Sequence, residues 1–223
     1  MIYFDNVSKY YATKQGRHYV LKNVDLELPT DRNIAVLGPN GVGKSTLIRM
    51  LGGADYPSRG EISSDQKISW PLGLQGGLQG SMSARENIRF VARIHGHKDT
   101  KAIEQQVERF AEIGKYFDEP VKSYSSGMKA RVSFGLTMAF EFDFDVLLVD
   151  ELGAVGDANF RRKSEALLKE KFEQTKLIMV SHSMAELRKN CQAGLVIIDQ
   201  TLHYHREIES AISAYEEHYV TAS

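Results

Sequence analysis

The sequence has one cysteine, no long apolar run and almost no net charge, and each shortage excludes a class of protein. Cys191 has no second cysteine for an intramolecular disulfide, which suits a reducing cytoplasm, and we expect a buried structural thiol there. No uninterrupted apolar stretch approaches about 18 residues, so we expect no bilayer-spanning segment. Residues 1–5 run directly into strand-like sequence, so no signal peptide is expected. The net charge of −1 gives no general attraction to nucleic acid, which argues against a DNA-compacting or helicase-like role.

The length and composition are those of a soluble globular chain. Its 223 residues, 42% hydrophobic and 26% charged, are enough to bury a full core as one domain, or one domain with a subdomain. Residues 1–28 alternate apolar and polar positions, which predicts antiparallel strands. From residue 146 onward strands alternate with helices, which indicates a parallel sheet with crossover helices. The predicted fold class is therefore α/β.

A helical insertion at 83–139 is expected to separate the two parts of this α/β core. Before this insertion, further short strands are expected at 61–62 and 67–69. Turn-rich residues at 12–17 and a glycine-rich connection at 73–80 interrupt the predicted strands. The helices expected from apolar spacing lie at 84–94, 100–113, 127–140, 161–174, 184–191 and 208–219.

The most informative segment is a glycine-rich loop between a short apolar run at 34–37 and a helix-like run at 46–51. It spells G-x-x-x-x-G-K-[ST], and we call it the phosphate loop: Gly38, Pro39, Asn40, Gly41, Val42, Gly43, Lys44, Ser45 and Thr46. Its backbone N–H groups and the dipole of the following helix attract a polyphosphate. Lys44 is predicted to neutralise the β- and γ-phosphates, and the Ser45 hydroxyl to hold Mg²⁺. A simple glycine turn is the alternative, and the flanking strand and helix argue against it.

Two acids follow an apolar run at 146–149. The run predicts a buried strand, and ligands of open α/β sheets bind at the carboxyl ends of such strands. Asp150 is suited to holding Mg²⁺ through water, and Glu151 to polarising the water that attacks a γ-phosphate. An acidic pair of this kind is usually solvated surface, and only the phosphate loop favours the catalytic interpretation.

A serine–glycine turn, Ser125-Ser126-Gly127, precedes a helix-like run. Taken alone, Ser125 or Ser126 is most simply an N-cap. A helix N-terminus of this kind is also an anion site. The position of the turn between the phosphate loop and the acidic strand favours the second interpretation.

These motifs together resemble those of the ATP-binding subunits of ATP-binding cassette (ABC) transporters. The phosphate loop, the turn, the Asp150-Glu151 pair and His182 occur in the family's order over nearly the whole chain. The turn departs from the usual S-G-G-Q, with serine for the first glycine and Met128 for glutamine. The resemblance implies one ABC ATP-binding domain over 1–223, with a RecA-like parallel-sheet core, an antiparallel β subdomain and a helical subdomain at 83–139.

Within that family the chain resembles bacterial polysaccharide exporters. The stretch D-E-L-G-A-V-G-D at 150–157 looks like their D-E-x-x-A-V-G-D. W-P-L-G-L at 70–74 and S-M-S-A-R-E-N-I at 81–88 look like the capsule-export branch.

The resemblance also implies roles for single residues. His182 is similar to the histidine that contacts the γ-phosphate. Tyr11 matches the aromatic that stacks on adenine, with Tyr10 as the alternative. Gln75 matches the glutamine that reaches Mg²⁺ and links to the membrane subunit, with Gln79 as the alternative. Residues 154–157 would meet the opposite subunit.

The function that the resemblance implies is an ATPase that powers export of a polysaccharide, most simply capsular, through an integral membrane subunit. ATP and Mg²⁺ would lie between two copies of the chain, at the cytoplasmic face of the inner membrane. The alternatives are an ABC ATPase for another exported substrate, a soluble ABC-type regulator of nucleic acid or ribosomes, and a nucleotide-binding module without turnover.

Two histidine pairs, His95 with His97 and His203 with His205, are spaced to share a strand face. Neither pair has a third ligand or a cysteine beside it, so no metal is expected there.

Overall fold

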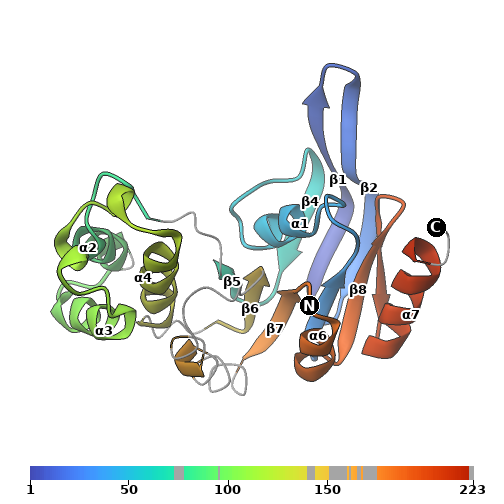
Figure 1. Cartoon of the computed structure of the whole chain (residues 1–223). Coiled ribbons are helices and arrows are strands. Elements are labelled where there is room, and N and C mark those ends of the chain that lie inside the picture. The colour runs from blue at the N-terminus through green and yellow to red at the C-terminus, as the bar shows by residue number, and fades with distance from the viewer. Residues whose placement is uncertain are drawn as a thin grey trace. The chain divides into compact units, whose positions relative to one another are not determined.

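The computed structural model describes residues 1–72, 78–94, 96–139, 144–150, 160, 162–164, 167 and 175–220. Strands and helices are labelled as in Figure 1. The strands are β1 (Ile2–Thr13), β2 (Gly16–Leu28), β3 (Ile34–Leu37), β4 (Arg59–Ser64), β5 (Ile68–Leu72), β6 (Val146–Asp150), β7 (Lys176–Val180), β8 (Ala193–Ile198) and β9 (Thr201–His205). The helices are α1 (Lys44–Leu51), α2 (Ala84–Ile94), α3 (Lys101–Ala111), α4 (Ser126–Ala139), α6 (Met184–Asn190) and α7 (Ile208–Tyr219), with 3₁₀ turns η1 (Gly114–Asp118) and η2 (Val121–Ser123).

The strands form two sheets. An antiparallel sheet has the order β2-β1-β4, and its β1–β2 hairpin extends well past β4 (Figure 1). A six-stranded sheet has the order β5-β6-β7-β3-β8-β9, in which β6, β7, β3 and β8 pair in parallel. Helices connect these parallel strands, which confirms the predicted α/β class. β9 pairs antiparallel with β8 and was not among the predicted strands.

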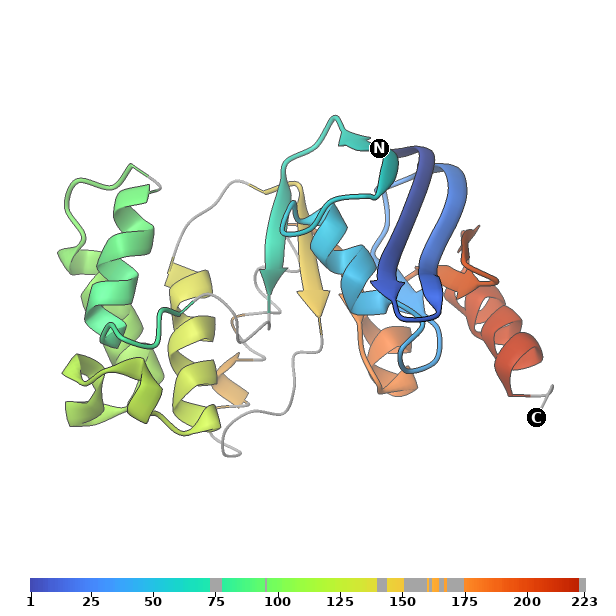
Figure 2. The ribbon, with the colours of Figure 1, turned by 90° about the horizontal axis from the view of Figure 1, so that it is seen from above.

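The chain divides into two compact units, and one of them contains both sheets with α1, α6 and α7. All four residues of β3 are buried, as expected for a parallel strand covered on both faces. α7 packs against β8 and β3 (Figure 2). The fit is close at Gly194, where an added Cβ would lie 2.2 Å from the Cβ of Ala211. β3, which leads into the phosphate loop, is therefore fixed in a fully buried position.

The other unit is built from α2, α3 and α4, which gather into one bundle (Figures 1 and 2). Its apolar core includes Ile88, Val107, Phe117 and Val132, all fully buried. α2 has the predicted bounds. α3 ends at Ala111, before the predicted end at residue 113, because Glu112 adopts a left-handed backbone with φ of 51°.

Candidate functional site

The strand order brings three of the predicted site segments to one edge of the large sheet. β7 lies between β6, which ends at Asp150, and β3, which leads into the phosphate loop. Asp150 pairs with Val180, the last residue of β7, and His182 follows two residues later. Because parallel strands end at the same edge, Asp150, His182 and the phosphate loop share the carboxyl edge of the sheet.

The phosphate loop depends on three glycines with left-handed backbones. Gly38, Gly41 and Gly43 have φ of 154°, 81° and 115°, which side chains rarely adopt. Gly43 is the N-cap of α1, and a Cβ there would lie 2.0 Å from Cγ1 of Val20. Close packing and backbone conformation thus both require glycine at 43, whereas an added Cβ at Gly41 meets no protein atom within 4 Å.

Lys44, the first residue of α1, folds back over the loop. Its Nζ donates to the carbonyl oxygens of Gly38 at 2.7 Å and Pro39 at 3.0 Å. The ammonium thus lies over the loop at the N-terminus of α1, where the helix dipole also favours an anion.

Ser45 and Asp150 meet at the sheet edge. The Ser45 Oγ donates to Asp150 Oδ1 at 3.3 Å, and Asp150 is only 5% exposed. A hydroxyl and a carboxylate are oxygen ligands of the kind that Mg²⁺ takes together with water and phosphate oxygens. The two residues therefore fit the predicted metal.

Tyr11, and not Tyr10, reaches the helix of the phosphate loop. The Tyr11 hydroxyl lies 3.4 Å from Thr46 Oγ1 and donates to Asp55 Oδ2 at 3.4 Å. Tyr10 instead packs within the β1–β2 hairpin, with its ring 5.2 Å from that of Tyr19 and the Arg17 guanidinium 4.5 Å away.

His182 lies on the exposed connection between β7 and α6. The next residue, Ser183, is the N-cap of α6, since its Oγ accepts from the backbone N–H of Glu186 at 3.3 Å. The cap orders the first turn of α6, which begins two residues after His182.

The serine–glycine turn begins α4 in the helical unit. The Ser125 Oγ accepts from the backbone N–H of Met128 at 3.2 Å, so Ser125 caps the helix as the simpler interpretation predicted. Ser125 and Ser126 are exposed, and an added Cβ at Gly127 would meet only the Ser125 Oγ, at 3.9 Å. The turn is therefore both a helix cap and an exposed helix N-terminus.

Some predicted site residues lie outside the described part of the chain. These are Gln75, Glu151 and the loop at 154–157. Gln79 is described: it is exposed, and its backbone N–H donates to Asn87 Oδ1 at 2.6 Å. The choice between Gln75 and Gln79 therefore stays a prediction.

Sequence reasoning missed two residues beside this site, Lys9 and Asp55. Lys9 is 7% exposed, and its Nζ lies 2.6 Å from Asp55 Oδ1. The position of this lysine next to the apolar residues of a strand could have predicted a buried ion pair, because a buried ammonium requires an anionic partner. The sequence does not identify that partner, which lies 46 residues away.

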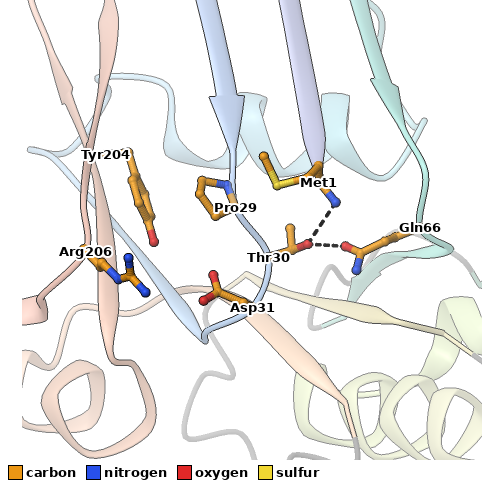
Figure 3. A pocket seen from close by; sticks show the side chains of 7 residues that line it. All are labelled: Met1, Pro29, Thr30, Asp31, Gln66, Tyr204 and Arg206. Carbon is orange, nitrogen blue, oxygen red and sulfur yellow. Dashed lines mark hydrogen bonds between the residues drawn. The ribbon is translucent and has the colours of Figure 1, made fainter.

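A pocket of about 390 Å³ lies elsewhere in the same unit (Figure 3). Thr30 in its wall accepts from the Met1 ammonium at 3.3 Å and donates to Gln66. Its lining residues are Met1, Pro29, Thr30, Asp31, Gln66, Tyr204 and Arg206. Pro29 to Asp31 precede β3 and the phosphate loop follows it, so this pocket belongs to the opposite end of the strand and contains no predicted site residue.

Two other kinds of site would be a cluster of metal-ligating side chains or a reactive cysteine. Within the described ranges, no three His, Cys, Asp or Glu side chains cluster as a metal site would require. Cys191 is buried as expected, and burial raises the pKa of its thiol to about 12. It is thus a packed thiol and not a nucleophile.

Comparison with known proteins adds family and fold. A family model described as ABC transporter matches residues 21–153. The chain is similar to the polysialic acid transport ATP-binding protein KpsT of Escherichia coli, with 46% identity over 97% of this chain and 96% of that protein. It is 41% identical to the ATP-binding protein BexA of Haemophilus influenzae, over 97% of this chain and 99% of that one. It is 40% identical to the capsule polysaccharide export ATP-binding protein CtrD of Neisseria meningitidis serogroup B, over 96% and 98%.

A solved structure shares the fold. The ATP-binding cassette MJ0796, in a dimeric post-hydrolysis state bound to ADP and Pi, superposes with a TM-score of 0.74 at 21% identity. The match covers 93% of this chain and 99% of that one. Across the described residues, no helix combines the length and the apolar character needed to cross a bilayer.

Proposed function

Because the chain belongs to the ABC transporter family, we propose that it is the ATPase subunit that powers export of a capsular polysaccharide through a separate membrane subunit. The observation that carries the ATPase function is the contact between Ser45 Oγ and Asp150 Oδ1, 3.3 Å apart at the edge where the phosphate loop ends. His182 follows β7, the strand that lies between β6, which ends at Asp150, and β3, which leads into the phosphate loop.

Each residue then has a role in holding or activating the nucleotide. The N–H groups of the phosphate loop and Lys44 bind the phosphates, and the ring of Tyr11 stacks on the base. Ser45, Asp150 and Gln75 would hold Mg²⁺, which would supply charge neutralisation to the phosphates. Glu151 polarises the attacking water, and His182 contacts the γ-phosphate.

A second copy of the chain completes the site. The turn at Ser125 to Gly127 is exposed at a helix N-terminus, and such an end attracts an anion. In the proposed dimer, each turn faces the phosphate loop of the other copy, and ATP lies between them. Closure of the dimer drives the membrane subunit, and hydrolysis resets it. Residues 83–139 act as the helical subdomain that carries the turn.

The proposal that the substrate is a polysaccharide is supported by the similar proteins. KpsT is described as a polysialic acid transport protein and CtrD as a capsule polysaccharide export protein, and both match along nearly their whole length. The chain accordingly works as a peripheral subunit at the cytoplasmic face of the inner membrane, bound to an integral membrane permease.

ATP turnover by the purified protein tests the ATPase function. We expect Glu151→Gln to lower turnover by about 100-fold or more, as loss of a general base does, while the protein stays folded by circular dichroism. Glu217→Gln, at an exposed site on α7, is the control. Turnover by wild type that rises more steeply than protein concentration supports the two-copy site, whereas strictly proportional turnover by verified monomers contradicts it.

Export is tested in cells from which the native gene has been removed. Wild-type protein should restore capsular polysaccharide at the cell surface, and Glu151→Gln should leave it inside the cell. Co-purification should recover an integral membrane protein. Normal surface polysaccharide with the Glu151→Gln variant would contradict the proposed function.

A further inference from the structure

Lys9 is a buried cation with a fixed partner. It lies on β1 two residues before Tyr11 and is only 7% exposed. Its Nζ donates to Asp55 Oδ1 at 2.6 Å and to the carbonyl oxygen of Tyr56 at 2.8 Å. Removing an ammonium from water is unfavourable unless it is paired, so this lysine is held in place by its two acceptors.

Asp55 uses both of its carboxylate oxygens. Oδ1 accepts from Lys9 and from the backbone N–H of Tyr56 at 2.8 Å, and Oδ2 accepts from the Tyr11 hydroxyl at 3.4 Å. Although burial acts to raise the pKa of Asp55, the hydrogen bonds from Lys9 and Tyr56 bring it below the ordinary value. The carboxylate is therefore ionised at neutral pH and remains available to Tyr11.

Tyr11 is anchored at its hydroxyl and open along its ring. The hydroxyl lies between Asp55 Oδ2 and Thr46 Oγ1, each 3.4 Å away. The Lys9 ammonium is 5.3 Å from the ring centroid, within range of a cation–π interaction. The residue nevertheless remains 42% exposed. A ring fixed at one end with an exposed surface is suited to stacking on a planar ligand.

We propose that Lys9 and Asp55 are positioning residues for the base of the nucleotide. They hold the Tyr11 hydroxyl beside Thr46, the last residue of the phosphate loop, so that a base stacks on an already ordered ring when the phosphates bind. This role rests on the proposed function, because it assumes that the phosphate loop binds a nucleotide. Lys9 and Asp55 themselves do not contact the reacting atoms.

The structure predicts a loss that depends on the base. In Asp55→Asn the hydrogen bond that holds the Tyr11 hydroxyl is weaker, so the ring is less ordered in the free protein. Binding of the base then has to offset part of the entropy of fixing the ring. Ordering one side chain corresponds to an affinity loss of about 3- to 10-fold. MgATP should bind that much more weakly, whereas magnesium tripolyphosphate, which has no base, should bind as it does to wild type. KM for ATP should rise by the same factor, with kcat within about twofold.

Tyr11→Phe provides an independent test, because it keeps the ring and removes only the tethered hydroxyl. It leaves the Lys9–Asp55 pair intact, so it stays informative if Asp55→Asn fails to fold with Lys9 unpaired. We expect the same selective loss of ATP affinity. The double variant should bind ATP no more weakly than either single variant, since both changes remove the same hydrogen bond. Tyr3→Phe, on the same strand and 38% exposed, is the matched control and should bind both ligands like wild type.

Calorimetric titration of the folded full chain with each ligand decides between the outcomes. Equal losses for ATP and tripolyphosphate would mean a general effect on the site and would overturn the positioning role. Unchanged ATP affinity in Tyr11→Phe would overturn it as well. If wild type binds ATP no more tightly than tripolyphosphate, the base contributes no affinity, and the positioning role is contradicted. If wild type binds neither ligand, the proposed function itself is contradicted.

Discussion

The Ser45 hydroxyl lies 3.3 Å from the Asp150 carboxylate, although 105 residues separate them. The two oxygens converge because β6 and β3, the strand that leads into the phosphate loop, are separated only by β7, and all three parallel strands end at the same edge of the sheet. This contact is where we expect the metal. It joins the phosphate loop, which is a continuous sequence motif, to an acidic residue at the end of a strand that is distant in the sequence.

Removal of magnesium should therefore stop turnover. Chelation with EDTA should abolish ATP hydrolysis, and added Mg²⁺ should restore it. Asp150→Asn keeps the shape of the side chain but removes its charge, so the concentration of Mg²⁺ that gives half-maximal turnover should rise at least about 10-fold. Titration of turnover with Mg²⁺ measures this. An unchanged magnesium requirement in the folded variant would remove Asp150 from the metal site.

Packing at Gly43 can be separated from its backbone conformation. Gly43→Ala should destabilise the fold by about 1–2 kcal/mol for the left-handed backbone, plus the cost of the contact with Val20. Gly41→Ala, with φ of 81° and open space, should show only the backbone cost.

A double variant measures the contact itself. Val20→Ala makes room for the added methyl group, so Gly43→Ala with Val20→Ala should be more stable than the two single costs predict, by about 1–3 kcal/mol. Urea unfolding followed by circular dichroism gives the four free energies. Strict additivity would show that the Val20 contact contributes nothing.

The stability of the helical unit should depend on pH through Glu104. This residue is 4% exposed and accepts two hydrogen bonds from Arg89, at 3.0 and 3.1 Å, and one from Thr100 at 2.7 Å. The Arg89 hydrogen bonds, against the opposing effect of burial, lower the pKa of Glu104. A lowered pKa means that the stabilisation is present above the unfolded value of about 4.3 and is lost as pH falls through the folded value.

Glu104→Gln should accordingly destabilise the protein by about 1–2 kcal/mol at pH 7. The difference from wild type should shrink as pH falls below about 4, because wild-type Glu104 then also loses its charge. Thermal unfolding across this range tests the sign, with the exposed Glu217→Gln as control. A difference that grows on acidification would contradict the assignment.

The single cysteine should report unfolding. Cys191 is buried and the pKa of its thiol is raised to about 12, so Ellman's reagent should react with the native protein at pH 8 only when the structure opens. Labelling in denaturant should be at least about 1,000-fold faster. Rapid stoichiometric labelling of the native protein would show that the thiol is accessible after all.

Local patterns were sufficient for much of the fold. The bounds of α2 follow from its apolar spacing, and those of α7 likewise. The sequence pattern did not predict the early end of α3, because the residue with the left-handed backbone is Glu112 and not the glycine that usually indicates a helix end. β5 runs from Ile68 to Leu72 through Pro71, beyond the strand expected at 67–69, and β9 was not predicted. Edge strands carry weaker sequence patterns, since only part of their surface is buried.

Local sequence alone specifies the phosphate loop, the acidic residue at a strand end and the serine–glycine turn, because each consists of neighbouring residues whose conformation follows from glycine, strand and helix preferences. The folded chain is needed to see that Tyr11 and not Tyr10 faces Thr46, that Asp55 is the partner of Lys9, and that Ser45 meets Asp150. Those pairs lie 35, 46 and 105 residues apart, and their proximity depends on strand order and hairpin register, which no local pattern specifies. The phosphate loop is thus a local property of the sequence, and the site around it is a property of the fold.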